Sequence, residues 1–375
     1  MTLAHHIDTI IQDAIGRRIF PGAVALAAWG GEIRHFTAYG TTMYDAPGSR
    51  PVALDTIYDV ASLTKVFTAT AVLRLADAGQ LDLHAPAADY LPELRAPGIA
   101  VFHLLTHTSG LDIRLSTLRG SGRDGVLAAA YAAAPIHPPG AAVAYTNVNS
   151  LLLGEIVARL RGEPLDTALH ELVIDPLGLC DTRFCPPAEL LPRIAPTEID
   201  ESWRGGLVHG NVHDESAHVL GGVAGHAGLF STAADLYRFC GMWLLAVSSQ
   251  QSAVSSQRPE DYLATGDRRL RTAERRVPSG ESFLKEETAR LATTNHTRGL
   301  NMGCGLGWMI DRPNFMGSAP VGTFGHTGFT GPALVVVPQE QLIVVVLSNR
   351  VYPRRRPPEH HTAIAAIVGA ALHAN

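Results

Sequence analysis

The apolar positions near the two ends of the chain predict a single β-sheet. Two apolar-rich stretches, Ala23–Trp29 and Glu32–Tyr39, are joined by a pair of glycines and predict a β-hairpin. The continuous apolar runs Ala333–Val337 and Leu342–Leu347 predict two further strands near the C-terminus. We expect the hairpin to pair with these strands, and a helix over Thr362–Leu372 to pack on the sheet.

Outside these strands the apolar spacing is that of amphipathic helices. An N-terminal helix would carry isoleucines on one face, and two later helices are expected to end at Gly79 and Gly162, because glycine is a common helix stop. A further helix is expected after Ser231-Thr232, where Asp235 would complete a capping box. The positions that define these helices are Ile7, Ile10, Ile11 and Ile15, then Val66, Ala69 and Leu73, and finally Leu151–Leu160.

These elements predict an α/β (α+β) protein in two parts. Residues 1–60 and 287–375 would form an antiparallel sheet flanked by helices, and residues 61–286 a mainly helical part, with a functional site between the two. Ala-Val-Ser-Ser-Gln occurs twice after position 245, and a charged stretch follows. Such repetitive polar sequence buries little apolar surface, so residues 246–276 are interpreted as a flexible surface insertion, with a functional lid as the minority alternative.

The tetrapeptide Ser62-Leu63-Thr64-Lys65 stands at the start of the helix that ends at Gly79. Unpaired N–H groups and the helix dipole at that end favour the alkoxide that forms when Ser62 loses its proton. A spacing of three places Lys65 on the same face, and a lysine in a dry cleft can lose its own proton near neutral pH. The pair indicates acyl transfer. Taken alone, it fits a serine cap followed by a solvated lysine better.

Two further motifs favour the catalytic interpretation. Tyr145-Thr146-Asn147 is expected in a loop, where a phenol and a carboxamide two residues apart project to the same side and can serve proton transfer and substrate hydrogen bonding. His326-Thr327-Gly328 is expected in an edge strand, whose glycines would let a substrate backbone approach while His326 and Thr327 bind a carboxylate or carbonyl. The ordinary alternatives are an asparagine cap beside a buried tyrosine, and a structural histidine.

In this order the motifs resemble those of the penicillin-recognising serine enzymes, which include serine β-lactamases, DD-peptidases and β-lactamase-like carboxylesterases. The resemblance extends from about Phe20 to about Arg350 and also includes His103–Gly110 and Gly228–Thr232. The tyrosine of the second motif is similar to that of the class C branch. The resemblance implies a site between an antiparallel sheet and a helical domain.

The resemblance also implies a role for the residues of the first two motifs. Ser62 would be acylated, and Lys65 and Tyr145 would share its proton, which leaves open which of them is the general base. Asn147 would orient the substrate amide. The backbone N–H groups of Ser62 and Phe329 would form the oxyanion hole.

The third motif sets this chain apart from many relatives. Those relatives carry lysine where this chain has His326, which is followed by Thr327 and Gly328 in the same substrate-binding segment. A histidine at pH 7 is mostly neutral unless a neighbour raises its pKa. Strong binding of a β-lactam carboxylate is therefore not expected.

A serine hydrolase that acts on a small ester or amide is the resulting prediction. A carboxylesterase is the leading candidate, an amidase or DD-peptidase acting on peptidoglycan fragments is second, and a β-lactamase is third. The motifs set the reaction type but not the leaving group, because all three reactions pass through the same tetrahedral oxyanion. A non-catalytic penicillin-recognising binding protein is the alternative from another class, although it would more often have lost Ser62 or Lys65. The chain contains no G-x-S-x-G nucleophile elbow and no H-E-x-x-H zinc motif.

Composition narrows the partners further. The 375-residue chain is 46% hydrophobic and 17% charged, with a net charge of −5 and no extended basic face, which argues against nucleic acid. No run approaches the roughly 18 apolar residues of a membrane span, and no secretory signal is visible, so a cytoplasmic location is expected. Its four cysteines predict free thiols. No cofactor is implied, and both a monomer and a homodimer remain open.

The stretch from His209 to His226 raises the question of a metal site. Its histidine spacings would suit helical ligands, but the glycines among them argue against a helix, so no metal site is predicted. We expect the glycine-rich run before His226 to form a wall of the cleft, with His213, Asp214 or His226 in contact with the substrate. These elements also resemble a branch of the superfamily that includes cell-wall-recycling amidases.

Overall fold

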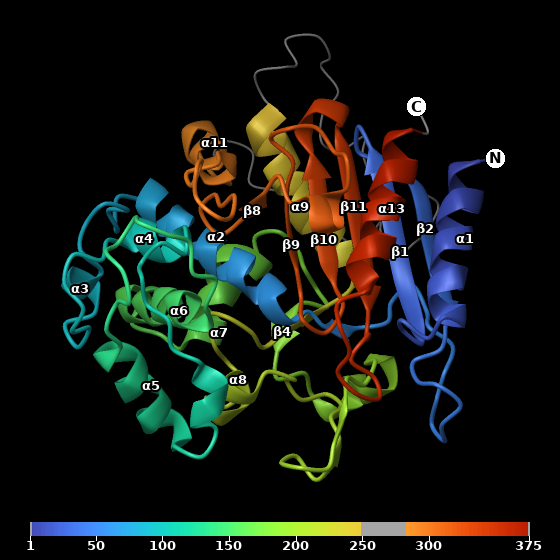
Figure 1. Ribbon diagram of the computed structural model, residues 1–375, viewed down its shortest axis with the longest axis horizontal. Coiled ribbons are helices and arrows are strands. Elements are labelled where there is room, and N and C mark those ends of the chain that lie inside the picture. The colour runs from blue at the N-terminus through green and yellow to red at the C-terminus, as the bar shows by residue number, and fades with distance from the viewer. Residues whose placement is uncertain (1, 249–282, 374–375) are drawn as a thin grey trace.

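A six-stranded antiparallel sheet forms the centre of one half of the molecule. The computed structural model describes residues 2–248 and 283–373, and its sheet has the strand order β2-β1-β11-β10-β9-β8 (Figure 1). The predicted hairpin and its pairing with the C-terminal strands are confirmed. The strands are β1 (Gly22–Trp29), β2 (Glu32–Gly40), β8 (Met309–Ile310), β9 (Phe324–Thr327), β10 (Ala333–Val337) and β11 (Leu342–Ser348).

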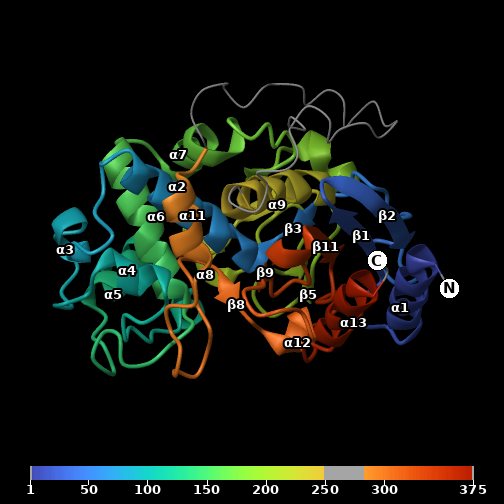
Figure 2. The same ribbon diagram turned by 90° about the horizontal axis from the view of Figure 1, so that it is seen from above.

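The inner strands β1, β10 and β11 are buried on both faces, because helices cover each face of the sheet (Figure 2), whereas the edge strand β2 is only partly buried. Successive side chains of a strand point to opposite faces, so Val24 of β1 packs toward one apolar cluster and Ala25 toward the other. The helices α1 (Leu3–Gly16) and α13 (His360–Leu372) cover one face, and α9 (Ala233–Ser248) lies on the other. This double cover explains why the strands read as continuous apolar runs.

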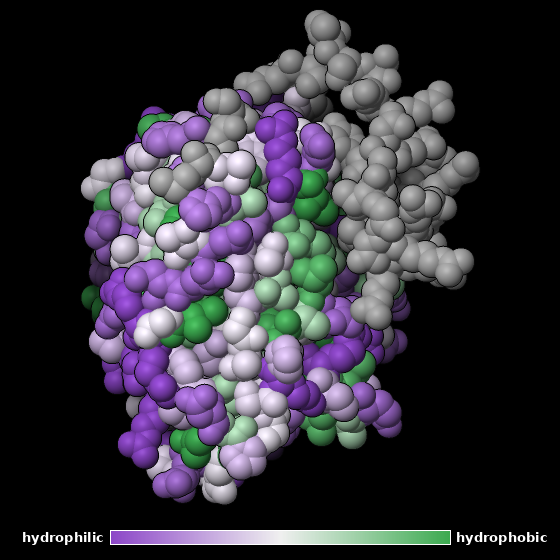
Figure 3. Space-filling view, turned by 90° about the vertical axis from the view of Figure 1, so that its right-hand side faces the viewer, coloured by the Kyte–Doolittle hydropathy of each residue, from purple (hydrophilic) through white to green (hydrophobic). Residues whose placement is uncertain are grey.

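The N-terminal helix has the amphipathic pattern expected from its isoleucines. Ile7 and Ile11 are fully buried against the sheet, while Ile10 and Ile15 are partly buried. Figure 3 views the molecule from the side of α1 and β2, where polar side chains cover much of the surface and apolar ones gather in a strip near its centre. The polar side of α1 therefore faces outward.

The other half of the molecule is built around two buried helices, α2 (Thr64–Asp77) and α6 (Asn147–Arg161), which pack against each other. The ring of Phe67 in α2 stacks on Phe239 of α9 with 4.1 Å between ring centroids, so α2 also packs against the sheet layer. Around them lie α3 (Ala87–Tyr90), α4 (Val101–Leu105), α5 (Gly122–Ala132), α7 (Leu165–Leu169), α8 (Glu215–Val219) and α11 (Glu286–Thr293). The short helix α12 (Pro313–Met316) belongs to the sheet half instead, where it packs against α13.

Short strands join the two halves. β3 (Tyr58–Asp59), β7 (Leu229–Ser231) and β4 (Arg183–Phe184) form a small sheet in which β7 is central, and β5 (Ile199–Asp200) pairs with β6 (Gly206–Leu207). One apolar cluster includes residues from both halves. The division of the chain into residues 1–60 with 287–375 and residues 61–286 stays a prediction, and α9 packs on the sheet although it falls in the second part.

Three local predictions need correction or restriction. The capping box at α9 is wrong: the N–H of Asp235 donates to Thr232 Oγ1, but the Asp235 carboxylate turns away and accepts from Asp181 N and Thr182 Oγ1 at 2.8 and 2.9 Å. Helix α6 begins at Asn147, four residues before the predicted start. Of the insertion predicted at 246–276, only 246–248 are described, and they belong to α9; the rest lies outside the described residues.

Two other expectations can be compared directly with the structure. All four cysteines are free thiols, as predicted, with Cys180 and Cys185 exposed and Cys240 and Cys304 buried. Within residues 2–248 and 283–373, no helix is both long and apolar enough to cross a membrane.

Candidate active site

Ser62 lies in a sharp turn between β3 and α2. The turn is the 3₁₀ segment η1 (Ala61–Leu63), and Ala61 adopts a positive φ of 46°. The side chain of Asp59 stabilises this turn from inside, since Oδ1 accepts from Ala61 N at 2.8 Å and Oδ2 accepts from His213 N at 2.6 Å. Ser62 therefore precedes the first turn of α2 and is partly exposed, as the sequence predicts.

Lys65 is the buried amine beside this hydroxyl, with 2% of its surface exposed. Its Nζ lies 2.9 Å from Ser62 Oγ, 3.0 Å from Asn147 Oδ1 and 3.1 Å from the carbonyl oxygen of His226. Burial lowers the pKa of Lys65 to about 7, although the nearby Asp214 carboxylate opposes the shift. A neutral amine has two hydrogens and one lone pair. If the hydrogens go to the two carbonyl-type oxygens, the lone pair points at Ser62.

Tyr145 completes the group around the serine hydroxyl. The Ser62 side chain is near enough to lower the pKa of the Tyr145 phenol slightly, and the Tyr145 ring lies 5.2 Å from Lys65 Nζ. Burial raises the pKa of Tyr145 well above its usual range, which keeps the phenol protonated at neutral pH. Asn301 holds the loop in place through two hydrogen bonds with the backbone of Val143, at 3.1 and 3.0 Å. Tyr145 thus lies in a loop, as predicted, whereas Asn147 lies at the first position of α6.

The third motif forms the end of β9. β8 pairs only with Phe324 and Gly325, so the edge strand of the sheet is β8, and the His326–Thr327 half of β9 has an open side. His326 is 1% exposed, and its Nδ1 lies 2.9 Å from the Thr327 carbonyl oxygen. Burial, with the neighbouring Lys65 charge, lowers the pKa of His326 to about 3. The ring is therefore neutral at pH 7.

The segment after β9 is fastened to the turn that carries Ser62. Thr330 Oγ1 donates to the carbonyl oxygen of Asp59 at 2.7 Å, and the N–H of Gly328 donates to Pro332 O at 2.7 Å. A Cβ at Gly328 would meet the carbonyl oxygen of Val60 at 2.6 Å, so only glycine permits this approach. The contacts place Phe329 at the same edge of the site as Ser62.

Phe329 itself is 47% exposed, but its ring is supported by polar neighbours. It stacks on His213 with 5.6 Å between centroids, and the Arg350 guanidinium lies 4.8 Å from its centroid. His213 Nε2 in turn lies 2.8 Å from Glu198 Oε2. His213 is itself only 5% exposed, so it offers the Phe329 ring a buried surface to pack against.

Asp214 and His226 form a second polar group behind Lys65 and Asn147. Asn147 Nδ2 donates to Asp214 Oδ2 at 3.2 Å, and His226 Nε2 lies 3.2 Å from Asp214 Oδ1. Burial alone would raise the pKa of Asp214, but the His226 ring, Ser216 and the Ala217 N–H outweigh it and hold this pKa well below its usual range. The His226 side chain is fully buried. A substrate contact by His226, as the sequence suggested, would require it to leave this position.

A sequence model of the Beta-lactamase family matches residues 7–369. The chain belongs to the Beta-lactamase family. Similar proteins include one named as an esterase and several named as putative carboxypeptidases. Esterase EstB from Burkholderia gladioli is 36% identical over 208 residues, which cover 49% of this chain and 52% of EstB. A putative D-alanyl-D-alanine carboxypeptidase from Escherichia coli K12 is 30% identical over 319 residues, which cover 76% of this chain and 66% of that protein.

The fold is also found in solved structures. EstCE1, described as a hydrolase with promiscuous acyltransferase activity, superposes with a TM-score of 0.72 at 21% identity, covering 97% of this chain and 98% of EstCE1. Identity this low supports the fold alone. The chain spans about half of the length of EstB and just under two thirds of the carboxypeptidase.

For this member of the Beta-lactamase family, sequence reasoning missed the role of His107. His107 has a positive φ of 56°, its ring packs 4.8 Å from that of Tyr145, and its Nδ1 lies 3.1 Å from Asn149 Nδ2. Burial lowers the pKa of His107 to about 3, so it supports Tyr145 as a neutral ring. The motif His103–Gly110 was the only signal in the sequence that pointed to this region.

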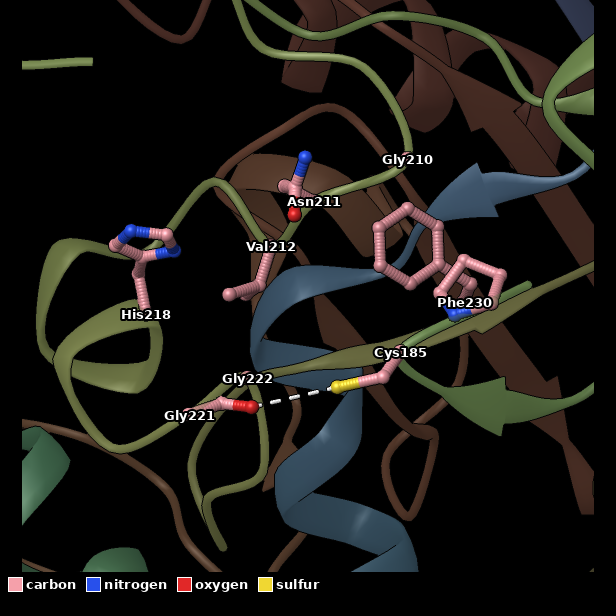
Figure 4. A pocket seen from close by; sticks show the side chains of 9 residues that line it. Cys185, Gly210, Asn211, Val212, His218, Gly221, Gly222 and Phe230 are labelled. Atoms are coloured by element: carbon pink, nitrogen blue, oxygen red, sulfur yellow. Dashed lines mark hydrogen bonds between the residues drawn. The ribbon is translucent and has the colours of Figure 1, made fainter. Parts of the chain in front are cut away.

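The histidines between 209 and 226 do not converge. Each contacts a different group: His209 the Ile194 carbonyl, His213 Glu198, His218 the Trp203 ring and His226 Asp214. In the part of the chain that the structure describes, no three metal-ligating side chains come together. A cavity of about 250 Å³ lies beside this stretch, lined among others by Cys185, Asn211 and His218, and none of the three motifs contributes to it (Figure 4).

Proposed function

We propose that this protein is a serine hydrolase that cleaves small esters or amides through an acyl-enzyme at Ser62. The observation that carries the proposal is the 2.9 Å contact between Ser62 Oγ and the Nζ of Lys65, whose pKa is lowered to about 7. A nucleophile in hydrogen-bond contact with a base that is partly neutral at pH 7 is the arrangement that acyl transfer needs. The family membership and the two enzymatic relatives support the same conclusion.

In the proposed reaction the proton of Ser62 passes to the lone pair of Lys65 while Oγ attacks the substrate carbonyl carbon. The carbonyl π bond becomes an oxyanion, which the backbone N–H groups of Ser62 and Phe329 stabilise; losing one such donor typically costs roughly 3 to 4 kcal/mol. The oxyanion then collapses and the bond to the leaving group breaks. Tyr145 donates its phenolic proton to the leaving group and regains a proton from Lys65. Water repeats the sequence to release the acid.

Lys65 is favoured over Tyr145 as the group that first accepts the proton. Burial disfavours the charged form of each residue, which makes the lysine partly neutral at pH 7 and keeps the tyrosine protonated. Neutral lysine is a base, whereas a protonated phenol is an acid. Tyr145 is thereby suited to protonate the leaving group.

Among substrates we favour uncharged esters, which makes a carboxylesterase the leading candidate. His326 is buried and neutral, so the third motif offers no cation for a substrate carboxylate. An amidase or DD-peptidase acting on peptidoglycan fragments is the second candidate, supported by the 30% identity with the Escherichia coli carboxypeptidase. A β-lactamase ranks third, because the neutral His326 offers no positive charge for the carboxylate of a β-lactam. The cytoplasmic location and the monomeric or homodimeric state remain proposals.

Hydrolysis of a p-nitrophenyl acyl ester tests this assignment. We expect the Ser62→Ala variant to lose roughly three or more orders of magnitude in kcat/KM. Ser202→Ala is the matched control, since this serine is exposed and lies on a hairpin away from the motifs. Equal rates for wild type and Ser62→Ala would refute the assignment. Cleavage of muropeptides by a protein inert toward esters would favour the amidase.

A further inference from the structure

We propose that Asp214, held in place by His226, is a positioning residue that fixes the amide of Asn147 and thereby directs the lone pair of Lys65 at Ser62. This inference rests on the proposed function and deepens it, because it assigns a task to residues outside the three motifs. Asp214 lies 67 residues from Asn147 in the sequence and reaches it from the N-terminal end of α8.

The Asn147 amide is held in one orientation. An asparagine side chain has a donor end and an acceptor end. A carboxylate accepts only, so the contact at 3.2 Å requires the NH₂ group of Asn147 to face Asp214 Oδ2. The carbonyl oxygen Oδ1 must then face the other way, where it lies 3.0 Å from Lys65 Nζ.

The orientation of Asn147 decides where the hydrogens of Lys65 point. Asn147 Oδ1 and the carbonyl oxygen of His226 both accept from Lys65 Nζ. When the amine is neutral, these two acceptors use both of its hydrogens and leave the lone pair for Ser62 Oγ at 2.9 Å. If the amide of Asn147 were reversed, its NH₂ group would compete with the serine hydroxyl for that lone pair. Asp214 excludes this reversed state.

Asp214 is itself held in place by three neighbouring groups. Its Oδ1 accepts from Ser216 Oγ at 2.6 Å and from Ala217 N at 2.9 Å, and lies 3.2 Å from His226 Nε2. His226 is fully buried and contacts both sides of the arrangement, with its ring at Asp214 and its backbone oxygen at Lys65. The preceding Gly225 carbonyl accepts from Thr68 Oγ1 at 2.9 Å, which ties this loop to α2.

Ser216, His226 and Asp214 do not form a second nucleophilic triad. Ser216 is fully buried and donates its proton to the carboxylate, so its oxygen is neither accessible nor activated by the histidine. The three side chains instead form a rigid support for one face of Asn147.

The charge of Asp214 gives the proposal a distinctive signature. Several titratable groups lie around Lys65. They are the side chains of Asp214, Tyr145, His107 and His326, together with His226, whose backbone oxygen accepts from Lys65 Nζ. Asp214 is the one whose charge raises the pKa of Lys65, against the larger effect of burial. Removing this charge should lower the pKa of Lys65 further. The acidic limb of the pH profile should then move to lower pH, which a loss of stability would not cause.

The test compares Asp214→Asn with Glu215→Gln, which removes a neighbouring carboxylate from the same helix start. For hydrolysis of a p-nitrophenyl ester between pH 5 and 9, we expect Asp214→Asn to lower kcat roughly 10- to 100-fold, because a displaced catalytic group loses rate steeply, and to move the lower limb below that of wild type. Glu215→Gln should keep kcat within about twofold of wild type and should leave the lower limb of the pH profile where it is. In an Asn147→Ala background, Asp214→Asn should lower kcat little further, because the positioning acts through Asn147, whereas the direct effect of the Asp214 charge on Lys65 should still move the lower limb.

Several outcomes would overturn the proposal. A folded Asp214→Asn variant with the wild-type kcat and the wild-type lower limb of the pH profile would overturn it. So would an Asp214→Asn change that lowers kcat as much in the Asn147→Ala background as in wild type. If Asp214→Asn fails to fold, His226→Gln takes its place; its backbone carbonyl remains for Lys65, and an unchanged kcat there would equally overturn the proposal. A wild type in which Ser62 is not needed for hydrolysis would overturn the proposed function as well. Ser62-dependent hydrolysis with an indifferent Asp214 would overturn the positioning role alone.

Discussion

The environment of Lys65 makes a quantitative prediction about the pH dependence of hydrolysis. Burial lowers the pKa of this lysine from 10.5 to about 7, which corresponds to a preference of roughly 5 kcal/mol for the neutral amine relative to a lysine in water. At pH 7 about half of the molecules would carry a free lone pair, against roughly one in 3,000 for a lysine with its ordinary pKa. The fold would therefore raise the concentration of the base about a thousandfold.

The assay is kcat/KM for a p-nitrophenyl ester from pH 5 to 9, corrected for spontaneous hydrolysis. Because protonated Lys65 cannot accept the proton of Ser62, the rate should fall about tenfold per pH unit below pH 6, bend near pH 7 and level off above pH 8. Tyr145→Phe should be slower but bend at the same pH, because the raised pKa of Tyr145 lies outside this range. Lys65→Arg stays charged and should be inactive throughout.

Two results would refute this reasoning. A kcat/KM that still rises about tenfold per pH unit at pH 9, with no bend near pH 7, would mean that Lys65 titrates as an ordinary solvated lysine. A lower limb that disappears in Tyr145→Phe would mean that the tyrosine, and not the lysine, accepts the proton.

The remaining predictions concern the packing of the site and the thiols. Gly225→Ala should lower the free energy of unfolding by about 2 to 4 kcal/mol, because a Cβ there would overlap the Ser150 carbonyl oxygen. In the control variant Gly241→Ala, the added Cβ in α9 meets nothing within 4 Å, so this variant should be neutral or slightly stabilised. Equal melting temperatures for the two variants would contradict the prediction. Burial raises the pKa of Cys304 to about 11 and that of Cys240 still further. A thiol reagent should therefore react with two thiols in the native protein and with four after unfolding. Four fast-reacting thiols in the native protein would contradict the prediction. The thiols that should react first are those of Cys180 and Cys185.

The fold was predictable where local sequence and burial agree. The runs that became β10 and β11 are apolar at every position because helices cover both faces of the sheet, and Ile7 and Ile11 follow the period of a helix with one buried side. The start of α6 at Asn147 was missed, because Tyr145-Thr146-Asn147 resembles a loop until the packing of α6 on α2 is known. Asp235 was given a local capping role, but its carboxylate serves a distant backbone group instead.

The motifs of the site were visible in the sequence, but their relations were not. The hydrogen bonds from Lys65 to Asn147 and from Asn147 to Asp214 join residues 82 and 67 positions apart. No periodicity within a segment encodes such contacts, because they depend on how α2, α6 and the start of α8 pack together. The same limit applies to His326: the sequence places it in a strand and favours a neutral ring, but its almost complete burial depends on the packing around β9.

The central claim is that Ser62 becomes covalently acylated, and intact-mass spectrometry with peptide mapping tests it most directly. After incubation with a p-nitrophenyl phosphonate, which stays on the nucleophile that it modifies, the wild-type protein should gain the mass of one phosphonyl group on the peptide that contains Ser62, and Ser62→Ala should gain none. A label on another residue, or unlabelled protein that still hydrolyses the corresponding ester, would contradict the account.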